Sequence, residues 1–252
     1  MNFQKKADYI RNEVIRVAIK NNMGHIAPSL SCVDILVALH YEVMAPEDSL
    51  IFSKAHGGYG LYAILADKGI ISREEWENFS LPGCIERMPE YGIEAGCGAL
   101  GHGLPMAAGA AFGKKLKKEK GFIYCLMGDG ETQEGTTWES VQFAVKHELD
   151  NLIIIIDNNK LQAMDFRINI LDKSYINLED RFKGFGLNPW YCDRSDAVCL
   201  IRIFKRMLVN ISKVPQILFV RTVKGHGLKC AENIPKFHYR VPNEQEYQLQ
   251  LS

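Results

Sequence analysis

The sequence has no excess of charge of either sign. Its 30 Lys and Arg residues equal its 30 Asp and Glu residues, so the formal net charge is zero. Proteins that bind nucleic acids or anionic membrane surfaces commonly carry a basic surface, and we therefore expect neither kind of partner. The basic run from Lys114 to Lys120 is explained as the solvated end of a helix, where the helix dipole favours cations.

Long apolar runs and paired cysteine motifs are also missing. The chain has no stretch of 18 apolar residues and no cleavable apolar leader, which predicts a soluble, cytoplasmic protein. Its seven cysteines are scattered without CxxC spacing, which predicts reduced thiols and argues against a zinc site. Repeats, low-complexity tracts and Pro/Gly-rich linkers are lacking too, so we expect one domain over residues 1–252.

Two apolar segments end abruptly in oxygen-bearing side chains. Phe122 to Met127 is apolar and β-prone, and it stops at Gly128-Asp129-Gly130. Leu152 to Ile156 has no polar alternation and ends at Asn158-Asn159. Such an uninterrupted run predicts a central parallel strand that is buried on both faces.

A helix is predicted between these two strands. Trp138, Val141, Ala144 and Val145 recur at helical spacing, which predicts a strand-helix-strand unit with a right-handed crossover. Both strands then end at the same edge of the sheet, where open α/β sheets bind ligands. A carboxylate from Asp129 and an amide oxygen from Asn159 suit Mg²⁺, and the flanking glycines let backbone approach phosphate oxygens closely.

The pair of motifs resembles the signature of thiamine diphosphate enzymes, which runs from GDG to NN. Here 27 residues separate Gly130 from Asn158, a spacing similar to that of the family. The segments MGHIAPSLSCVDILVALHYEVM, FSKAHGGYGLYAILADKG and YGIEAGCGALGHGLPMAAGAAFGKKL resemble successive blocks of transketolases. The resemblance covers about Asp8 to Tyr239 and is to the N-terminal subunit of split, two-chain transketolases.

The resemblance implies a set of functional residues. Side chains of Asp129 and Asn159 and the carbonyl of Leu161 are expected to bind Mg²⁺. Three histidines are expected to serve catalysis, because imidazoles can give and accept protons near neutral pH. His25 and His56 are expected to contact substrate hydroxyls, and His238 is expected near the coenzyme phosphates and the reacting centre. Glu134 is expected in a network that reaches the partner subunit, although it could also be a first-turn acid favoured by the helix dipole. The residues expected around thiamine diphosphate are Gly98, Leu100, Gly128, Asp129, Gly130, Glu131, Asn159 and Gln162.

One functional group that the family requires has no counterpart in this sequence. The glutamate that activates the coenzyme's aminopyrimidine comes from a second, pyrimidine-binding domain, and the segment after His238 is too short to hold one. The resemblance therefore implies a partner, the C-terminal (pyrimidine-binding) transketolase subunit, in a heterotetramer with two copies of each chain. Sugar or sugar-phosphate substrates are expected, with transfer of a two-carbon ketol unit between a ketose and an aldose.

One departure from the family bears on the substrate. LPGCIERMPEYG places Cys84 where transketolases carry a substrate-contacting histidine, so contact with the standard ketose is in doubt. HYRVPN resembles tails of split transketolases that work in unusual-sugar pathways. Two alternatives stay open at this point: a split thiamine diphosphate enzyme that acts on a 2-oxoacid, and a non-catalytic scaffold subunit that keeps the fold.

The remaining patterns predict an α/β fold, with a doubly wound, mostly parallel sheet and helices on both faces. Residues 4–21, Ser31 to Met44 and Gly58 to Lys68 are predicted helices, and Asp196 is predicted to cap a helix that runs to Ile211. Ser72 and Glu75 have the spacing of a capping box. Residues 216–223 form a further apolar strand.

Overall fold

Five parallel strands form one sheet at the centre of the protein. The computed structural model describes residues 1–171, 177–210 and 212–251. The strand order is β1-β2-β3-β5-β4, and every pairing is parallel. This confirms the predicted fold class and the three strands predicted from apolar runs. The strands are β1 Ser49–Phe52, β2 Ile123–Gly128, β3 Leu152–Asn158, β4 Pro189–Cys192 and β5 Gln216–Arg221.

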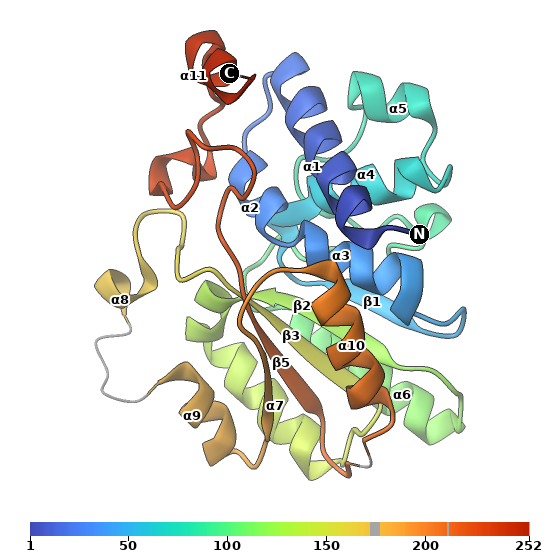
Figure 1. Cartoon of the computed structure of the whole chain (residues 1–252). Helices are drawn as coiled ribbons and strands as arrows, with labels where there is room; N and C mark the ends of the chain where they lie inside the picture. Colours follow the sequence, from blue (N-terminus) through green and yellow to red (C-terminus); the bar gives the residue numbers. More distant parts are fainter. Residues whose placement is uncertain (172–176, 211, 252) are drawn as a thin grey trace.

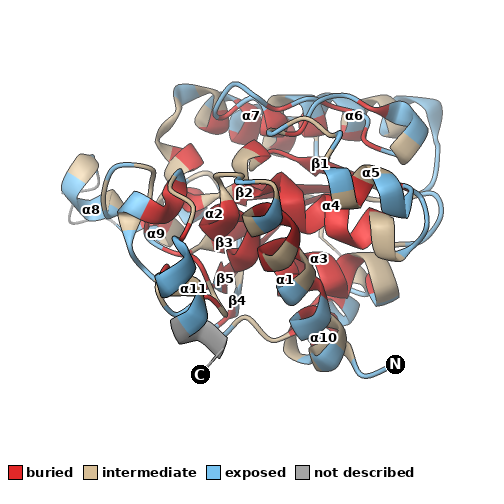
Figure 2. Cartoon of the chain, turned by 90° about the horizontal axis from the view of Figure 1, so that it is seen from above, coloured by how far each residue is buried: buried red, intermediate tan, exposed pale blue. Residues whose placement is uncertain are grey.

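Helices cover both faces of the sheet. On one face lie α6 and α7, which pack against each other, and α6 also packs on the three strands β1, β2 and β3. Helices α1, α3 and α10 cover the opposite face, as the view along the sheet shows (Figure 2). The helices are α1 Phe3–Lys20, α2 Ile26–Ser31, α3 Val33–Ala38, α4 Gly58–Asp67, α5 Arg73–Asn78, α6 Gly103–Lys117, α7 Gly135–Lys146, α8 Arg167–Ile170, α9 Leu178–Gly184, α10 Ala197–Leu208 and α11 Glu244–Leu251.

The central strands are buried on both faces, as their apolar runs predict. All residues from Ile153 to Ile156 in β3 are fully buried, and so are Tyr124 to Met127 in β2. Each buried aliphatic side chain of this kind stabilises the fold by about 1.5–3 kcal/mol relative to leaving it in water. The sheet is therefore a rigid base for whatever its strand ends carry.

Two predicted helix caps are confirmed, and one predicted helix start is wrong. Ser72 and Glu75 form the predicted capping box at α5, and Oδ1 of Asp196 accepts the N–H of Cys199 over 2.7 Å at the start of α10. Helix α10 ends at Leu208, and Ile211 lies outside the described residues. The helix predicted from Ser31 to Met44 is wrong in its start, because Ser31 ends α2 instead. Helix α3 follows, and a π-helical turn over Leu39–Val43 continues it.

The carboxyl ends of four strands meet at one edge of the sheet, which lies toward the centre of Figure 1. Here β1 is followed by Ser53 and Lys54, β2 by Asp129, β3 by Asn159 and β5 by a loop that holds Lys224. Short 3-10 turns over Ala55–Gly57, Asp129–Gln133 and Pro235–His238 bring further polar residues to this edge. In the described part of the chain, no helix is long and apolar enough to cross a membrane.

Candidate active site

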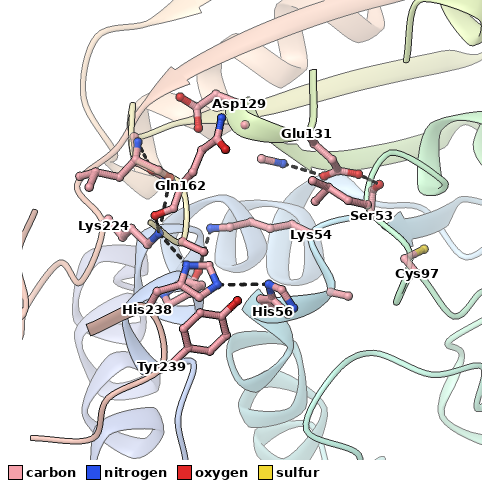
Figure 3. Close-up of a pocket in the computed structure, with 18 of the residues that line it drawn as sticks. Ser53, Lys54, His56, Cys97, Asp129, Glu131, Gln162, Lys224, His238 and Tyr239 are labelled. Atoms are coloured by element: carbon pink, nitrogen blue, oxygen red, sulfur yellow. Dashed lines mark hydrogen bonds between the residues drawn. The ribbon is translucent and has the colours of Figure 1, made fainter. Parts of the chain in front are cut away.

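A cavity of about 250 Å³ opens at this edge of the sheet (Figure 3). Residues at or just after the ends of β1, β2, β3 and β5 line it, as expected for a parallel α/β sheet. The C-terminal segment closes one side through His238 and Tyr239. The lining residues are Pro28, Ser53, Lys54, Ala55, His56, Cys97, Gly98, Leu100, Gly128, Asp129, Gly130, Glu131, Asn159, Leu161, Gln162, Ala163, Lys224, His238 and Tyr239.

Asp129 is a fully buried carboxylate with one unpartnered oxygen. Its Oδ2 accepts the backbone N–H of Lys160 over 2.8 Å and lies 3.7 Å from the guanidinium of Arg167. Its Oδ1 is buried and has no hydrogen-bond partner in the described structure. Burial raises the pKa of Asp129 to about 6, although the Arg167 charge opposes that rise. A buried carboxylate oxygen without a partner is costly unless a cation or donor meets it.

Asn159 and Leu161 line the same cavity as Asp129 and bring two more oxygen atoms to this region, an amide oxygen and a backbone carbonyl. The side-chain N–H₂ of Asn159 donates to Oδ1 of Asp157 over 3.2 Å, which fixes the direction of the amide. Its Oδ1 accepts the backbone N–H of Leu161 over 3.0 Å and retains a second lone pair. A carboxylate, an amide oxygen and a backbone carbonyl form the kind of all-oxygen set that suits Mg²⁺. The residues present therefore fit a divalent metal.

A buried ion pair between Lys54 and Asp157 lies next to Asn159. Lys54 follows β1 and donates to Asp157 in β3, to Oγ of Ser31 over 2.6 Å and to the carbonyl of Pro28 over 2.7 Å. Burial opposes the charge on Lys54, but Asp157 outweighs it and raises the pKa of the lysine. Burial likewise acts to raise the pKa of Asp157, and the Lys54 charge and hydrogen bond keep it below its ordinary value. Thr222 also donates to this carboxylate.

Glu131 ties two glycine-containing segments to the sheet. Its carboxylate accepts the backbone N–H of Gly128 over 3.0 Å and that of Gly101 over 3.2 Å, and it also accepts the hydroxyl of Ser53. Only 2% of Glu131 is exposed. The loop that carries Gly98 and Leu100 is thereby held against the GDG turn, so Glu131 has a structural part in shaping the cavity.

Three histidines gather at the other end of the cavity. The rings of His25 and His56 stack with centroids 4.4 Å apart and planes 10° from parallel. Nε2 of His238 lies 3.2 Å from Nδ1 of His56. Burial lowers the pKa of all three rings, to about 4 for His25 and about 2 for His238, and neighbouring positive groups add to the effect. All three imidazoles are therefore neutral near pH 7.

Lys224 lies between the histidines and the part of the cavity that holds Gln162. Its Nζ lies 2.7 Å from the carbonyl of Gln162 and 2.8 Å from Nδ1 of His238. Burial and the Lys54 charge lower the pKa of Lys224 to about 7. Figure 3 shows the lysine between Gln162 and His238, with its amino group turned into the cavity.

The structure brings most of the predicted site residues together. The lining includes every residue predicted to surround the coenzyme or metal, and also His56 and His238. His25 lies behind His56 and does not line the cavity. Glu134 does not line it either: its side chain packs so tightly on Gly101 that a Cβ there would lie 2.7 Å from that of Glu134. Cys84 also lies outside the lining, and its carbonyl accepts from the hydroxyl of Tyr62.

Sequence reasoning missed three charged residues of the site. Asp157 and Lys224 each come just after a predicted strand, whereas Lys54 follows β1, a strand that the sequence analysis did not predict. Their position at a carboxyl edge was a usable signal, since ligands bind there. Their contacts could not be predicted from the sequence, because they join residues that are far apart in it. Lys54 and Asp157, for example, are separated by 103 positions.

A parallel sheet with a polar cavity at its carboxyl edge defines an α/β ligand-binding domain, and comparisons with known proteins narrow the class. Residues 1–174 match the family model described as 1-deoxy-D-xylulose-5-phosphate synthase. An apulose-4-phosphate transketolase subunit of Actinobacillus succinogenes is 36% identical over 98% of this chain and 94% of its own length. The corresponding protein of Phocaeicola vulgatus is 34% identical over 94% of this chain and 88% of its own length.

Further matches agree. The 6-deoxy-6-sulfo-D-fructose transketolase subunit SqwG of a Clostridium species is 32% identical over 92% of this chain and 88% of its own length. The crystal structure of transketolase from Campylobacter jejuni superposes with a TM-score of 0.88 at 27% identity, over 98% of this chain but only 42% of that one. The chain belongs to the transketolase family, in which it corresponds to the N-terminal part of a split transketolase.

Proposed function

We propose that the chain is the diphosphate-binding subunit of a two-chain transketolase that uses thiamine diphosphate and Mg²⁺. The observation that carries the proposal is Oδ1 of Asp129, which is buried without a partner at a cavity that Asn159 and Leu161 also line. A divalent cation would supply the missing partner, and phosphate oxygens would complete its coordination. When bound, thiamine diphosphate supplies the carbanion chemistry of ketol transfer.

The chain's own residues then have defined parts. Asp129, Asn159 and the carbonyl of Leu161 would hold the metal. Gly98, Leu100, Gly128, Gly130, Glu131 and Gln162 would shape the cavity around the coenzyme. His56 and His238 would contact the hydroxyl and carbonyl oxygens of the substrate, and His25, which does not line the cavity, would act through its stack on His56.

A partner chain is part of the proposal. Residues 1–252 would act as one diphosphate-binding domain, which covers only 42% of the solved C. jejuni transketolase. The remainder, including the glutamate that activates the aminopyrimidine, would come from a C-terminal subunit in a heterotetramer. Glu134, at the start of α7 and outside the cavity, would contact that partner rather than the ligand. This is the role that the family resemblance implies for it.

The substrates proposed are a ketose, phosphorylated or otherwise acidic, and an aldose acceptor from an unusual-sugar pathway. The support comes from relatives named for apulose 4-phosphate and for 6-deoxy-6-sulfo-D-fructose. Cys84 is the residue in this chain that marks a departure from ordinary transketolases.

Turnover by the purified two-chain complex tests the proposal. We expect transfer of a two-carbon unit from a ketose phosphate to an aldehyde, dependent on Mg²⁺ and thiamine diphosphate. The complex carrying Asp129→Asn should lose this activity. Release of CO₂ from a 2-oxoacid without ketol transfer would assign the chain to another thiamine diphosphate enzyme. Full activity of the Asp129→Asn complex would refute the metal assignment.

A further inference from the structure

Two cysteine side chains meet beside the outermost strand of the sheet. Cys192 is the last residue of β4, and Cys199 lies in the first turn of α10. Their sulfur atoms are 3.6 Å apart, which is direct contact. Strand β4 is the last in the strand order, next to β5. The contact therefore joins the edge of the sheet to the helix that follows it in the chain.

The turn between the two cysteines is held in place by several hydrogen bonds. Oδ1 of Asp196 accepts the backbone N–H of Cys199 over 2.7 Å, and Sγ of Cys192 lies 3.0 Å from the carbonyl of Arg194. The hydroxyl of Ser195, in the same turn, donates to a buried carboxylate of α3 over 3.1 Å. Because the backbone is fixed on both sides of the sulfur contact, the fold itself keeps the two thiols together.

The two thiols differ in their access to solvent. Cys192 is only 2% exposed, whereas Cys199 is half-buried. Burial raises the pKa of Cys192 to about 12, and the neighbouring Cys199 adds to that rise. A dissolved oxidant can therefore reach Cys199 but not Cys192. An accessible cysteine beside a second thiol that can resolve its oxidised form is the usual arrangement of a redox-active pair.

From this geometry we propose that Cys192 and Cys199 form a reversible disulfide, with a small dissolved disulfide such as oxidised glutathione as the oxidant. Both cysteines are free thiols in the structure, so the disulfide is a second state of the same site. It would tie the end of β4 to the first turn of α10. Neither cysteine lines the cavity, so disulfide formation and coenzyme binding are separate properties of the chain.

The reaction takes two thiol–disulfide exchange steps. The thiolate of Cys199 attacks one sulfur of oxidised glutathione, forms a mixed disulfide and releases one glutathione thiolate, which takes up a proton. Sγ of Cys192 then loses its proton and attacks Sγ of Cys199, which breaks the mixed disulfide and releases the second glutathione. In total, two cysteine thiols are oxidised to one disulfide, and one oxidised glutathione is reduced to two thiols.

The movement required for the second step is short. A disulfide bond is about 2.05 Å long, so each sulfur must move by about 0.8 Å from its present position. Rotation of each side chain about its Cα–Cβ bond can supply a shift of this size. The thiol of Cys192 gives up its contact with the carbonyl of Arg194 when it loses its hydrogen.

Redox titration of the purified full chain, followed by peptide mass mapping, tests the proposal. The chain is equilibrated with mixtures of reduced and oxidised glutathione, its remaining thiols are alkylated, and it is digested without reductant. We expect two of the seven thiols to be lost, a crosslinked peptide that contains Cys192 and Cys199, and full recovery of the thiols with dithiothreitol. Seven free thiols at every ratio, a crosslink between other cysteines, or a persistent glutathione adduct on Cys199 would overturn the proposal.

Three serine variants test the order of the two steps. Cys192→Ser should stop after the first step and accumulate one glutathione on Cys199, whereas Cys199→Ser should leave the buried Cys192 unmodified. Cys230→Ser is the matched control, since Cys230 is another half-buried thiol, and it should form the crosslink as readily as the unaltered chain does. Folded Cys192→Ser without an adduct would contradict Cys199 as the thiol that reacts first. Mapping of the unaltered chain decides on the disulfide itself without any variant.

Discussion

The backbone N–H of Lys160 donates to Oδ2 of Asp129 over 2.8 Å, and this contact leaves Oδ1 of the same carboxylate buried and unpartnered. Lys160 has a positive φ of 65°, a conformation in the left-handed region that side-chain-bearing residues seldom adopt. The strand β3 ends directly before the Asn159-Lys160 pair. The turn after this strand therefore holds one oxygen of the acid, and the other oxygen is the one that the proposed metal would bind.

Asp129→Asn is expected to abolish Mg²⁺-dependent binding of thiamine diphosphate without destabilising the fold. The amide keeps an oxygen for the N–H of Lys160 but removes the negative charge that the metal needs. Isothermal titration calorimetry on the two-chain complex measures binding, and denaturant unfolding of the chain measures its stability. Retained metal-dependent binding in the variant would contradict the assignment of Asp129.

The same substitution predicts a particular pH dependence in Mg²⁺-free buffer. The pKa of Asp129 is raised from 3.8 to about 6 in the folded state, so the folded protein binds this proton more tightly than the unfolded chain does. Its contribution is therefore most favourable below about pH 4 and is lost as the pH rises through about 6. We expect the stability of Asp129→Asn relative to the unaltered chain to increase by about 2 kcal/mol from pH 4 to 7. If the difference in unfolding free energy between the two proteins does not vary with pH, burial does not raise the pKa of this carboxylate.

Lys54→Met is expected to destabilise the isolated chain by about 3–5 kcal/mol, because it leaves the buried carboxylate of Asp157 without its cation. Adding Asp157→Asn should recover part of this loss, which a double-mutant cycle of unfolding free energies measures. The exposed pair of Lys205 and Glu42 is the matched control, and Lys205→Met should cost under about 1 kcal/mol. Equal losses for the two lysine variants would contradict the importance of the buried pair.

Two glycines of helix α6 are expected to respond oppositely to alanine. A Cβ on Gly103 would lie 2.2 Å from Cβ of Ser53, whereas a Cβ on Gly109 meets nothing within 4 Å. Gly103→Ala should therefore lower the unfolding free energy by about 1–3 kcal/mol and disturb the bond from Ser53 to Glu131. Gly109→Ala should raise it by about 0.5–1 kcal/mol. Thermal unfolding of both variants measures these changes. If Gly103→Ala stabilised the protein, the start of α6 could not be packed against Ser53 as described.

The sequence could predict the sheet and much of the cavity because both depend on local patterns. Uniform apolar runs predict buried parallel strands, and a polar residue after such a run lies at the carboxyl edge wherever the strand is placed in the sheet. Asp129, Asn159 and Gln162 were found on that basis, together with a family resemblance.

The contacts that orient these residues could not be predicted in the same way. The carboxylate of Asp157 accepts hydrogen bonds from Lys54, which follows β1, and from Thr222, which follows β5. These strands are far from β3 in the sequence and come near it only in the folded sheet. The start of the helix expected at Ser31 was missed for a related reason. Oγ of Ser31 donates to Asp157 over 2.7 Å, so tertiary contact rather than helix capping determines its place.

The central claim, that this chain holds half of a thiamine diphosphate site and needs a partner for the other half, is tested most directly by native mass spectrometry. The tagged chain would be purified from its own cells in the presence of Mg²⁺ and thiamine diphosphate. We predict an assembly with two copies of this chain, two copies of a second chain, bound coenzyme and bound metal. An assembly of this chain alone, with no coenzyme and no metal, would contradict the account.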